Sequence, residues 1–298
     1  MKQIVIAKND SGQRLDKFLS KFMPAMPMSM LYKSLRKNCV RVNGKHIRDG
    51  AYIVNERDEL SLYFKDEFFK KEEIKITDNP DIDIIYEDDN IIIVNKPQGL
   101  VVHTDNKGTE DTLIARIHSY LYKSGKYNPA HEQSFVPALC NRIDRNTSGL
   151  VIAAKNAEAL RIINEKIKNR EIKKFYMCIT NNIPPKKEDT IISHLSRDDK
   201  KVKISNEGKE IKTKYKVVKT KGTCALLEIE LLTGRTHQIR AQMADIGCPL
   251  KGDVKYGAAP NGTYKLCSYR IEFSFSTHSG KMEYLNGKTI KIKPQFEL

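Results

Sequence analysis

The feature that most constrains the fold of this chain is a polar segment followed directly by an apolar one. Residues 141–149 read Asn-Arg-Ile-Asp-Arg-Asn-Thr-Ser-Gly, and residues 150–154 are all apolar. Polar segments that end in glycine form turns, and a short apolar run after a turn is typical of a buried strand. We therefore expect Asp144 to lie on a turn that leads into a core strand, with Arg142 and Arg145 beside it.

Two interpretations of Asp144 follow from its flanking arginines. Guanidinium groups favour the ionised form of a carboxyl and attract polyanions, so this acid is suited to act on nucleic acid without a metal. The alternative is a surface ion pair that caps the turn, and structural ion pairs are commoner than catalytic ones. The local pattern favours the structural interpretation, and the rest of the chain reverses that preference.

The charge balance indicates a polyanionic partner. The chain has 298 residues, which suggests about two domains, and its hydrophobic fraction of 40% is that of a globular protein. Lys and Arg together number 52 against 37 Asp and Glu, which gives a net charge of +15. This excess favours RNA, DNA or an acidic membrane surface, although a soluble protein with a lysine-rich surface would have the same charge.

The sequence predicts a cytoplasmic protein without a membrane segment. No stretch approaches the roughly 20 apolar residues that span a bilayer, and the N-terminus is charged too early for a signal peptide. The cysteines are scattered and include no Cys-x-x-Cys pair, which argues against zinc and against a disulfide framework. We expect them to be free thiols: Cys39, Cys140, Cys178, Cys224, Cys248 and Cys267.

Residues 12–64 are predicted to form a compact module. Apolar residues at i, i+3, i+4 and i+7 indicate one helix, and Ser29 is the expected N-cap of a second. Asn43-Gly44 lies between short alternating runs and predicts a hairpin turn. The inward-facing helical residues are expected to be Leu15, Phe18, Leu19 and Phe22, then Leu31 and Leu35.

The cations of this module are expected to form an RNA-binding face. Lys33, Arg36 and Lys37 share a side of the second helix that its apolar residues do not occupy. Together with residues 14–19 and 40–45, this basic helix resembles the alpha-L RNA-binding motif. That family usually has Gly-Asp near its last strand, where this chain has Arg57-Asp58.

The remaining chain is predicted to be a linker, residues 65–81, followed by an α+β domain, residues 82–298, with a large, mostly antiparallel sheet. Thr112 and Asn156 are the expected N-caps of two of its helices. The other elements expected there are strands at 82–86, 91–94 and 224–232 and a helix at 235–246 that ends at Gly247.

Four segments of this second domain carry candidate functional residues. Each is weak when taken alone, because a single His, Tyr or Lys is more often structural than functional. They are residues 95–103 with Lys96 and His103, the Asp144 segment, residues 173–176 with Tyr176, and residues 232–240 with Arg235, His237 and Arg240.

Taken together and in order, these segments resemble the RluA-type pseudouridine synthases over residues 82 to about 295. The resemblance implies a catalytic domain with a curved mixed sheet around a central cleft, behind the N-terminal RNA-binding module. The implied reaction breaks the bond from ribose to nitrogen 1 of uridine, rotates the base and rebuilds the bond at carbon 5. It needs neither a cofactor nor a metal.

The resemblance also implies roles for individual residues. Asp144 matches the essential aspartate, which either attacks the sugar or base or removes a ribose proton to give a glycal. Tyr176 matches the aromatic residue that stacks on the target base, and Arg240 matches the partner that orients the aspartate. Arg142 matches the residue that enters the RNA stack when the uridine leaves it. Further contacts to phosphate or base are expected from Lys96, His103, Arg145, Arg235 and His237.

Large-subunit ribosomal RNA is the expected substrate and a monomer the expected state. One departure from the family supports a different hypothesis, a catalytically inactive RNA-binding factor in ribosome assembly. The family usually has His where this chain has Asn141, and Asn cannot titrate near neutral pH. A nuclease or methyltransferase is disfavoured, since clustered metal-binding carboxylates are not evident and the sequence has neither a Gly-x-Gly-x-x-Gly segment after a strand nor a Walker-type loop.

Overall fold

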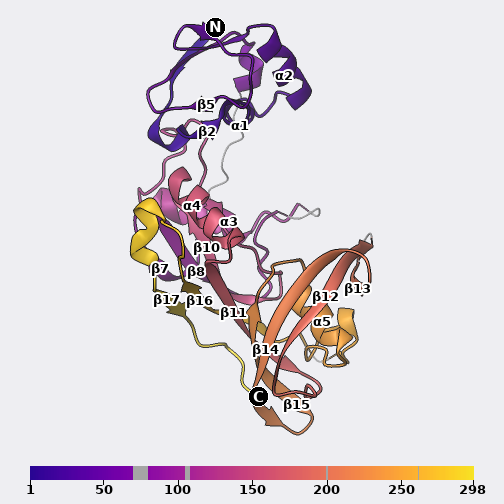
Figure 1. Cartoon of the computed structure of the whole chain (residues 1–298). Coiled ribbons are helices and arrows are strands. Elements are labelled where there is room, and N and C mark those ends of the chain that lie inside the picture. The colour runs from indigo at the N-terminus through magenta and orange to yellow at the C-terminus, as the bar shows by residue number, and fades with distance from the viewer. Residues whose placement is uncertain (70–79, 105–107, 199–200, 261) are drawn as a thin grey trace. The chain divides into compact units, whose positions relative to one another are not determined.

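The computed structural model describes residues 1–69, 80–104, 108–198, 201–260 and 262–298 (Figure 1). The chain divides into two compact units, which are described separately. The first contains residues 1–80, 117–138 and 155–158, and the second contains residues 81–116, 139–154 and 159–298. Within the described ranges, no helix is long and apolar enough to cross a membrane.

The first unit is built around a small antiparallel sheet and two short helices. The sheet has the order β1-β6-β3-β4, and β2 pairs separately with β5. The strands are β1 (Lys2–Val5), β2 (Gln13–Arg14), β3 (Val40–Val42), β4 (Lys45–His46), β5 (Ile53–Val54) and β6 (Glu59–Leu62). The helices are α1 (Leu15–Phe22) and α2 (Met28–Arg36), and two 3-10 turns are η1 (Lys8–Asp10) and η2 (Asp66–Phe69).

The apolar faces predicted for α1 and α2 are confirmed, because all six of their predicted core residues are buried. Asn43 and Gly44 both have positive φ, 49° and 77°, as a two-residue hairpin turn requires. The predicted cap at Ser29 is wrong. Pro27 is the N-cap of α2, and the helix begins at Met28, so Ser29 already lies inside the first turn. Of the predicted linker, residues 70–79 lie outside the described residues.

A segment distant in sequence completes the first unit. The side chain of Gln133 donates to the carbonyl of Val5 at 2.6 Å and accepts from the amide of Ala7 at 3.2 Å. The carboxylate of Asp10, which is fully buried, accepts from both the hydroxyl and the amide of Ser134. These bonds explain why residues 117–138 group with the N-terminal module.

The second unit contains an eleven-stranded mixed sheet of order β13-β12-β14-β15-β11-β16-β10-β8-β7, with β17 paired to β16 and β9 to β10. β10 runs parallel to β16, whereas the neighbours from β13 to β16, those from β10 to β7 and the β16–β17 pair are antiparallel. The strands in the first half of the unit are β7 (Asp83–Glu87), β8 (Ile91–Lys96), β9 (Ala138–Leu139), β10 (Ser148–Ala154) and β11 (Ile172–Thr180). The others are β12 (Glu188–Asp198), β13 (Lys201–Ser205), β14 (Lys209–Lys221), β15 (Cys224–Leu231), β16 (Leu266–Phe273) and β17 (Thr289–Lys291). The predicted α+β class with a mostly antiparallel sheet is confirmed.

The helices α4 (Ala157–Lys168) and α5 (Gln238–Asp245) and the 3-10 turns η3 (Val254–Tyr256) and η4 (Gly280–Leu285) lie mainly in this unit. The helix α3 (Leu113–Lys123) begins in the second unit, and its residues 117–123 belong to the first. The predicted cap of α3 is confirmed, because Thr112 Oγ1 accepts from the amide of Ala115 at 3.2 Å. Ile163 of α4 packs with Ile93 of β8 and Ile152 of β10, all fully buried, so the predicted apolar run after Gly149 is a core strand.

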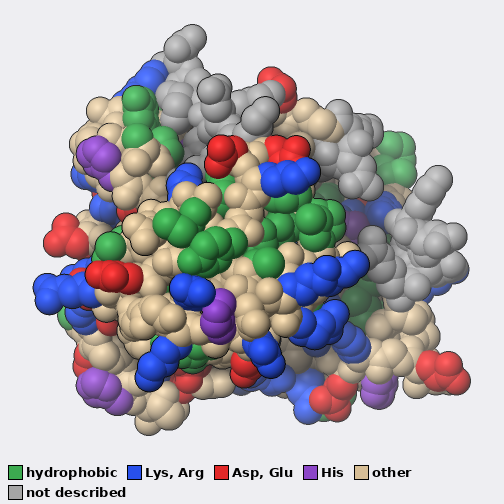
Figure 2. Space-filling model, turned by 90° about the horizontal axis from the view of Figure 1, so that it is seen from above, with side chains coloured by type: hydrophobic (Ala, Val, Ile, Leu, Met, Phe, Trp, Pro, Cys, Tyr) green, Lys and Arg blue, Asp and Glu red, His purple; other side chains and the backbone are tan. Residues whose placement is uncertain are grey.

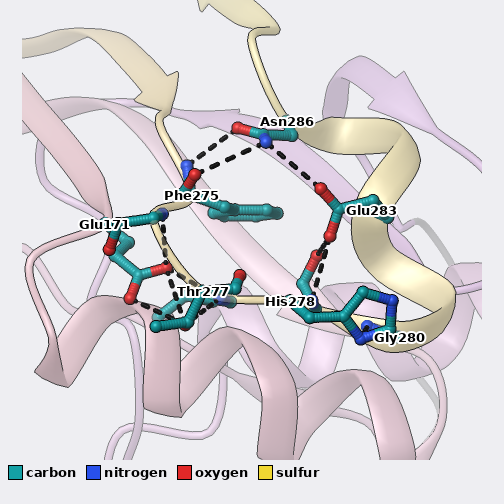
Figure 3. Close-up of polar contacts among 10 residues, drawn as sticks. Glu171, Phe275, Thr277, His278, Gly280, Glu283 and Asn286 are labelled. Atoms are coloured by element: carbon teal, nitrogen blue, oxygen red, sulfur yellow. Dashed lines mark hydrogen bonds and ion pairs between the residues drawn. The ribbon is translucent and has the colours of Figure 1, made fainter.

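A polar cluster fastens the end of α4 to the C-terminal part of the chain (Figure 3). The carboxylate of Glu171 accepts from Lys166 Nζ at 2.7 Å and from the hydroxyl of Thr277 at 3.0 Å. The bond from Lys166 and the others around it lower the pKa of Glu171 to about 2. Asn286 and Glu283 hold the next turns of the same segment through bonds to Phe275 and Ser279. This network holds the segment around Thr277 against the end of α4 and has a structural role.

β10 and β16 approach so closely that Gly149 leaves no room for a side chain. Gly149 has φ +111°, and a Cβ there would lie 2.2 Å from the carbonyl oxygen of Ser268. We predict that Gly149→Ala lowers the free energy of unfolding by more than about 2 kcal/mol, measured by urea denaturation. Gly99→Ala is the control, because Gly99 has φ +92° with no atom within 4 Å of such a Cβ. If Gly149→Ala and Gly99→Ala lost the same free energy of unfolding, the close approach of residue 149 to Ser268 would not be the cause of the loss.

Candidate active site

A cavity of about 420 Å³ in the second unit is lined by six of the nine site residues predicted for the catalytic domain. This volume is within the usual range for small-molecule and nucleotide sites. The walls come from the turn before β10, from β11, from the loop that precedes α5 and from α5 itself. The residues that matter for its chemistry are Asn141, Arg142, Asp144, Lys174, Tyr176, Arg235, His237 and Arg240.

Asp144 faces α5. Its Oδ2 accepts from Arg240 Nη1 at 3.3 Å and lies 3.7 Å from His237 Nε2, and a quarter of the side chain is exposed. The expectation that Arg142 and Arg145 pair with Asp144 is wrong. Both side chains are exposed, because the carboxylate turns inward from the loop while its sequence neighbours turn toward solvent. The cation that pairs with Asp144 is Arg240, which lies almost a hundred residues further along the chain.

Arg240 is held from several sides. Its Nε and Nη2 donate to the two oxygens of Asp253 at 2.7 and 2.8 Å, and its guanidinium carbon lies 5.0 Å and 4.3 Å from the ring centres of Tyr256 and Tyr264. Burial opposes the charge, but the bond to Asp253 and the nearby negative charges raise the pKa of Arg240. The pair with Asp253, which is 1% exposed, leaves Nη1 to contact Asp144. The sequence did not indicate that Asp253 and Tyr256 would support Arg240.

The helix that carries Arg240 begins later than predicted. Residues 235–237 are not helical, because His237 adopts the left-handed conformation with φ 56° and α5 starts at Gln238. Consequently Arg235 lies in an exposed loop, and His237 points toward the cavity, where its Nδ1 is 3.0 Å from the hydroxyl of Tyr256. Burial lowers the pKa of His237, against the opposing charge of Asp144.

Two buried glutamines fix α5 on the sheet. Gln238 Nε2 donates to the carbonyl of Lys212 at 3.1 Å and to the hydroxyl of Thr213 at 2.9 Å. Gln242 accepts from the same hydroxyl at 2.6 Å and donates to Ser193 at 2.8 Å. Gln238 and Gln242 lie two residues before and two residues after Arg240, so their bonds hold the turn of the helix that carries it. The sequence did not predict that these two residues are buried, because hydrophobic periodicity identifies only apolar side chains as core.

Tyr176 lies on β11 in the wall of the cavity and is 5% exposed. Burial is the main cause that raises the pKa of its phenol to about 12, and the charge of Asp144 adds to the effect. The phenol is therefore protonated at neutral pH and offers both an aromatic face and a hydrogen-bond donor to whatever enters. Its placement beside Asp144 agrees with the predicted grouping of the two residues.

The expected RNA contact by Lys96 is contradicted. The side chain is fully buried, and its Nζ donates to the carbonyls of Pro97, Leu100 and Arg145 at 2.8, 2.7 and 2.9 Å. Burial lowers the pKa of Lys96 to about 8, against the charge of Asp144. All three N–H donors of Lys96 are used in these bonds, so none is left for a phosphate. The bond to the carbonyl of Arg145 stabilises the Asp144 turn.

Asn141 has a similar supporting position. It is 7% exposed, and its Oδ1 accepts from the amide of Ile152 at 2.8 Å while its Nδ2 donates to the carbonyl of Leu150 at 3.5 Å. An amide makes both bonds, as donor and as acceptor, without titrating. The residue that departs from the family pattern therefore joins the Asp144 turn to β10.

The remaining predicted contacts lie on exposed surface. Arg142 and Arg235 line the cavity with exposed side chains, whereas His103 and Arg145 are exposed outside its lining. In the first unit the predicted basic face of α2 is exposed, at Lys33, Arg36 and Lys37. Figure 2 shows Lys and Arg side chains spread over the face in view, consistent with the net charge of +15. Among the described residues, no cluster of His, Cys, Asp or Glu is arranged to hold a metal ion.

Comparisons with known proteins agree with this arrangement. Residues 90–245 match the RNA pseudouridylate synthase family, and residues 13–60 match the S4 domain. An uncharacterized RNA pseudouridine synthase of Mycoplasma capricolum is 30% identical over 99% of both chains. Ribosomal large subunit pseudouridine synthase C of Escherichia coli is 31% identical over 86% of this chain and 80% of its own.

A solved structure has the same catalytic fold. Human RNA pseudouridylate synthase domain containing 4 superposes with a TM-score of 0.57 and 20% identity, over 71% of this chain and 88% of its own. The family match covers more than half of the present chain and includes the Asp144 turn, β11 and α5. The chain therefore belongs to the RNA pseudouridylate synthase family and carries an S4 RNA-binding domain at its N-terminal end.

Proposed function

We propose that this enzyme converts specific uridines of large-subunit ribosomal RNA to pseudouridine, with Asp144 as the catalytic aspartate. One observation carries the proposal: three chain segments bring Asp144, Tyr176 and Arg240 to one cavity, and Arg240 bonds to Asp144. The substrate is taken from relatives, such as the Escherichia coli synthase, that are named for the ribosomal large subunit.

In this proposal the target uridine leaves the RNA stack and enters the cavity. Stacking of the base on Tyr176 contributes about 1–3 kcal/mol, which offsets part of the cost of extrusion. Arg240 holds the carboxylate of Asp144 in one orientation toward the ribose or base through the bond from its Nη1. Arg142, exposed at the rim, takes the place of the extruded uridine, and Arg235 and His237 contact the RNA near the opening.

The proposed domain boundaries are 12–64 for the RNA-binding module, 65–81 for the linker and 82–298 for the catalytic domain. We further propose that the enzyme acts as a monomer in the cytoplasm and needs neither a cofactor nor a metal. The position of Asn141 supports an active enzyme, since the structural bonds of that residue need no titrating group. The replacement of His by Asn at position 141 is therefore no longer an argument for a catalytically inactive assembly factor.

The basic face of α2 is expected to supply affinity more than specificity. We predict that replacing Lys33, Arg36 and Lys37 together with Ala weakens RNA binding and lowers the slope of log K against log salt by about 2 to 3, since each lost phosphate contact contributes about 0.7 to 0.9. The measurement is binding to full-length ribosomal RNA between low and moderate salt. If turnover and salt slope both stay at wild-type values, α2 is not a binding face.

A comparison of modification maps tests the proposed function in cells. Pseudouridines in ribosomal RNA are mapped at single-nucleotide resolution in parent cells, deletion cells and deletion cells that express Asp144→Asn. We expect at least one large-subunit position to lose pseudouridine in the second and third strains. Identical maps in all three, together with tight RNA binding by the purified protein, would favour the inactive binding factor.

A further inference from the structure

The wall of the cavity contains a cation for which the described residues supply no partner. Lys174 lies on β11, two residues before Tyr176, and successive even positions of a strand face the same side. Its side chain is half-buried and lines the cavity. No hydrogen bond or ion pair of any described residue reaches its Nζ. Burial lowers the pKa of Lys174, and no neighbouring acid opposes that effect.

The amine of Lys174 lies against the loop that carries Arg235. A Cβ built on Gly234 would lie 3.8 Å from Lys174 Nζ, which is an ordinary van der Waals distance. Glycine has no side chain there to cover the amine. Because Lys174 and Tyr176 line the same cavity, RNA that enters it would meet both side chains.

The charges around the cavity identify the chemistry of that ligand. Among the described residues, Asp144 is the one acid in the lining, and Arg240 already pairs with it. Lys174, Arg142 and Arg235 are thus cations without a carboxylate partner in the lining. Burying a lysine amine without a counter-ion costs free energy, so this arrangement is favourable only when an anion arrives.

We propose that Lys174 is a binding residue for an RNA phosphate next to the target uridine. The amine contacts a phosphodiester oxygen while the base enters the cavity against Tyr176. The inference rests on the proposed function for the identity of the nucleotide, but the phosphate contact is testable by binding alone. An ammonium group is a compact point charge and suits a single phosphate oxygen.

The first test is binding of a ten-residue oligouridylate by the full-length protein over a range of salt concentrations. Lys174→Met keeps most of the side-chain length without the charge, and it should weaken binding about tenfold and lower the salt slope by about 0.7. Lys173→Met is the matched control, because Lys173 is exposed on the other face of β11 and its loss changes the net charge equally. The control should change binding less than about twofold.

A stability measurement separates this role from a structural one. Removing an unpartnered, half-buried amine should leave the thermal midpoint of Lys174→Met unchanged or raise it. A lower midpoint with unchanged oligouridylate binding would mean that the amine stabilises the fold and would overturn the proposal.

The second test uses RNA with a single neutral methylphosphonate at the phosphate on either side of the uridine that the wild-type enzyme modifies. At one of these positions the neutral linkage should weaken RNA binding by the wild type about tenfold and leave RNA binding by Lys174→Met unchanged, because the variant lacks the amine that would contact this phosphate. If at both positions the neutral linkage weakened binding by the two proteins equally, the proposed contact would be overturned. If the wild type forms no pseudouridine in any RNA, the proposed function fails, and the oligouridylate result still decides the role of Lys174.

Discussion

Asp144→Asn should abolish pseudouridine formation and leave RNA binding intact. Asn keeps the shape of the side chain but cannot act as nucleophile or base, and losing such a group costs roughly 10³-fold or more in rate. The measurement is single-turnover formation of pseudouridine in large-subunit ribosomal RNA with enzyme in excess. Arg240 retains its two bonds to Asp253 in this variant, so we expect its unfolding midpoint to stay close to that of the wild type.

Asp245→Asn is the control for that variant, because Asp245 is an exposed carboxylate at the end of the same helix that carries Arg240. It should retain full turnover. If Asp144→Asn kept more than a tenth of the wild-type rate, the catalytic role of Asp144 would be wrong, whatever happened to the control.

The second large effect is expected from Asp253→Asn, mainly on stability. Arg240 is 6% exposed, and removal of one partner of a buried ion pair costs up to about 3–5 kcal/mol. Asp144 would remain as the second carboxylate beside the guanidinium, at 3.3 Å, but a quarter of its side chain is exposed. The measurement is the free energy of unfolding from urea denaturation. Turnover under conditions where the variant is folded should also fall, because Nη1 of Arg240 would no longer be directed at Asp144.

Asp111→Asn is a closely matched control for the ion pair. Asp111 receives two bonds from Arg116, at 2.7 and 2.8 Å, which reproduces the geometry around Asp253, but 58% of its side chain is exposed. Exposed pairs contribute about 0–1 kcal/mol. Similar losses in the two variants would contradict the argument that burial makes the Arg240 pair important.

Local pattern predicted much of the fold because the relevant interactions are local. The i, i+3, i+4 spacing of α1, the Asn43-Gly44 turn and the cap by Thr112 each depend on residues within one turn of chain. The start of α5 was predicted three residues early. Residues 235–237 contain neither Gly nor Pro, and it is the left-handed backbone of His237 that delays the start of the helix.

The grouping of Asp144, Tyr176 and Arg240 was predictable only through resemblance to a family. The supporting residues were not predicted, because nothing in the spacing of Asp253, Gln238 or Gln242 indicates what each side chain contacts after folding. For Lys96 the prediction of an RNA contact was wrong, because the side chain is buried. A lysine beside a turn is usually a surface cation, and here three backbone carbonyls hold it inside.

Tritium release tests the central claim most directly. Large-subunit ribosomal RNA carrying tritium at carbon 5 of uridine is incubated with the wild-type protein and with Asp144→Asn. Because the new glycosidic bond replaces the hydrogen at carbon 5, the wild type should release one tritium for each pseudouridine formed, and the variant should release none above background. No release by the wild type, or equal release by both proteins, would contradict the assignment of uridine isomerisation to Asp144.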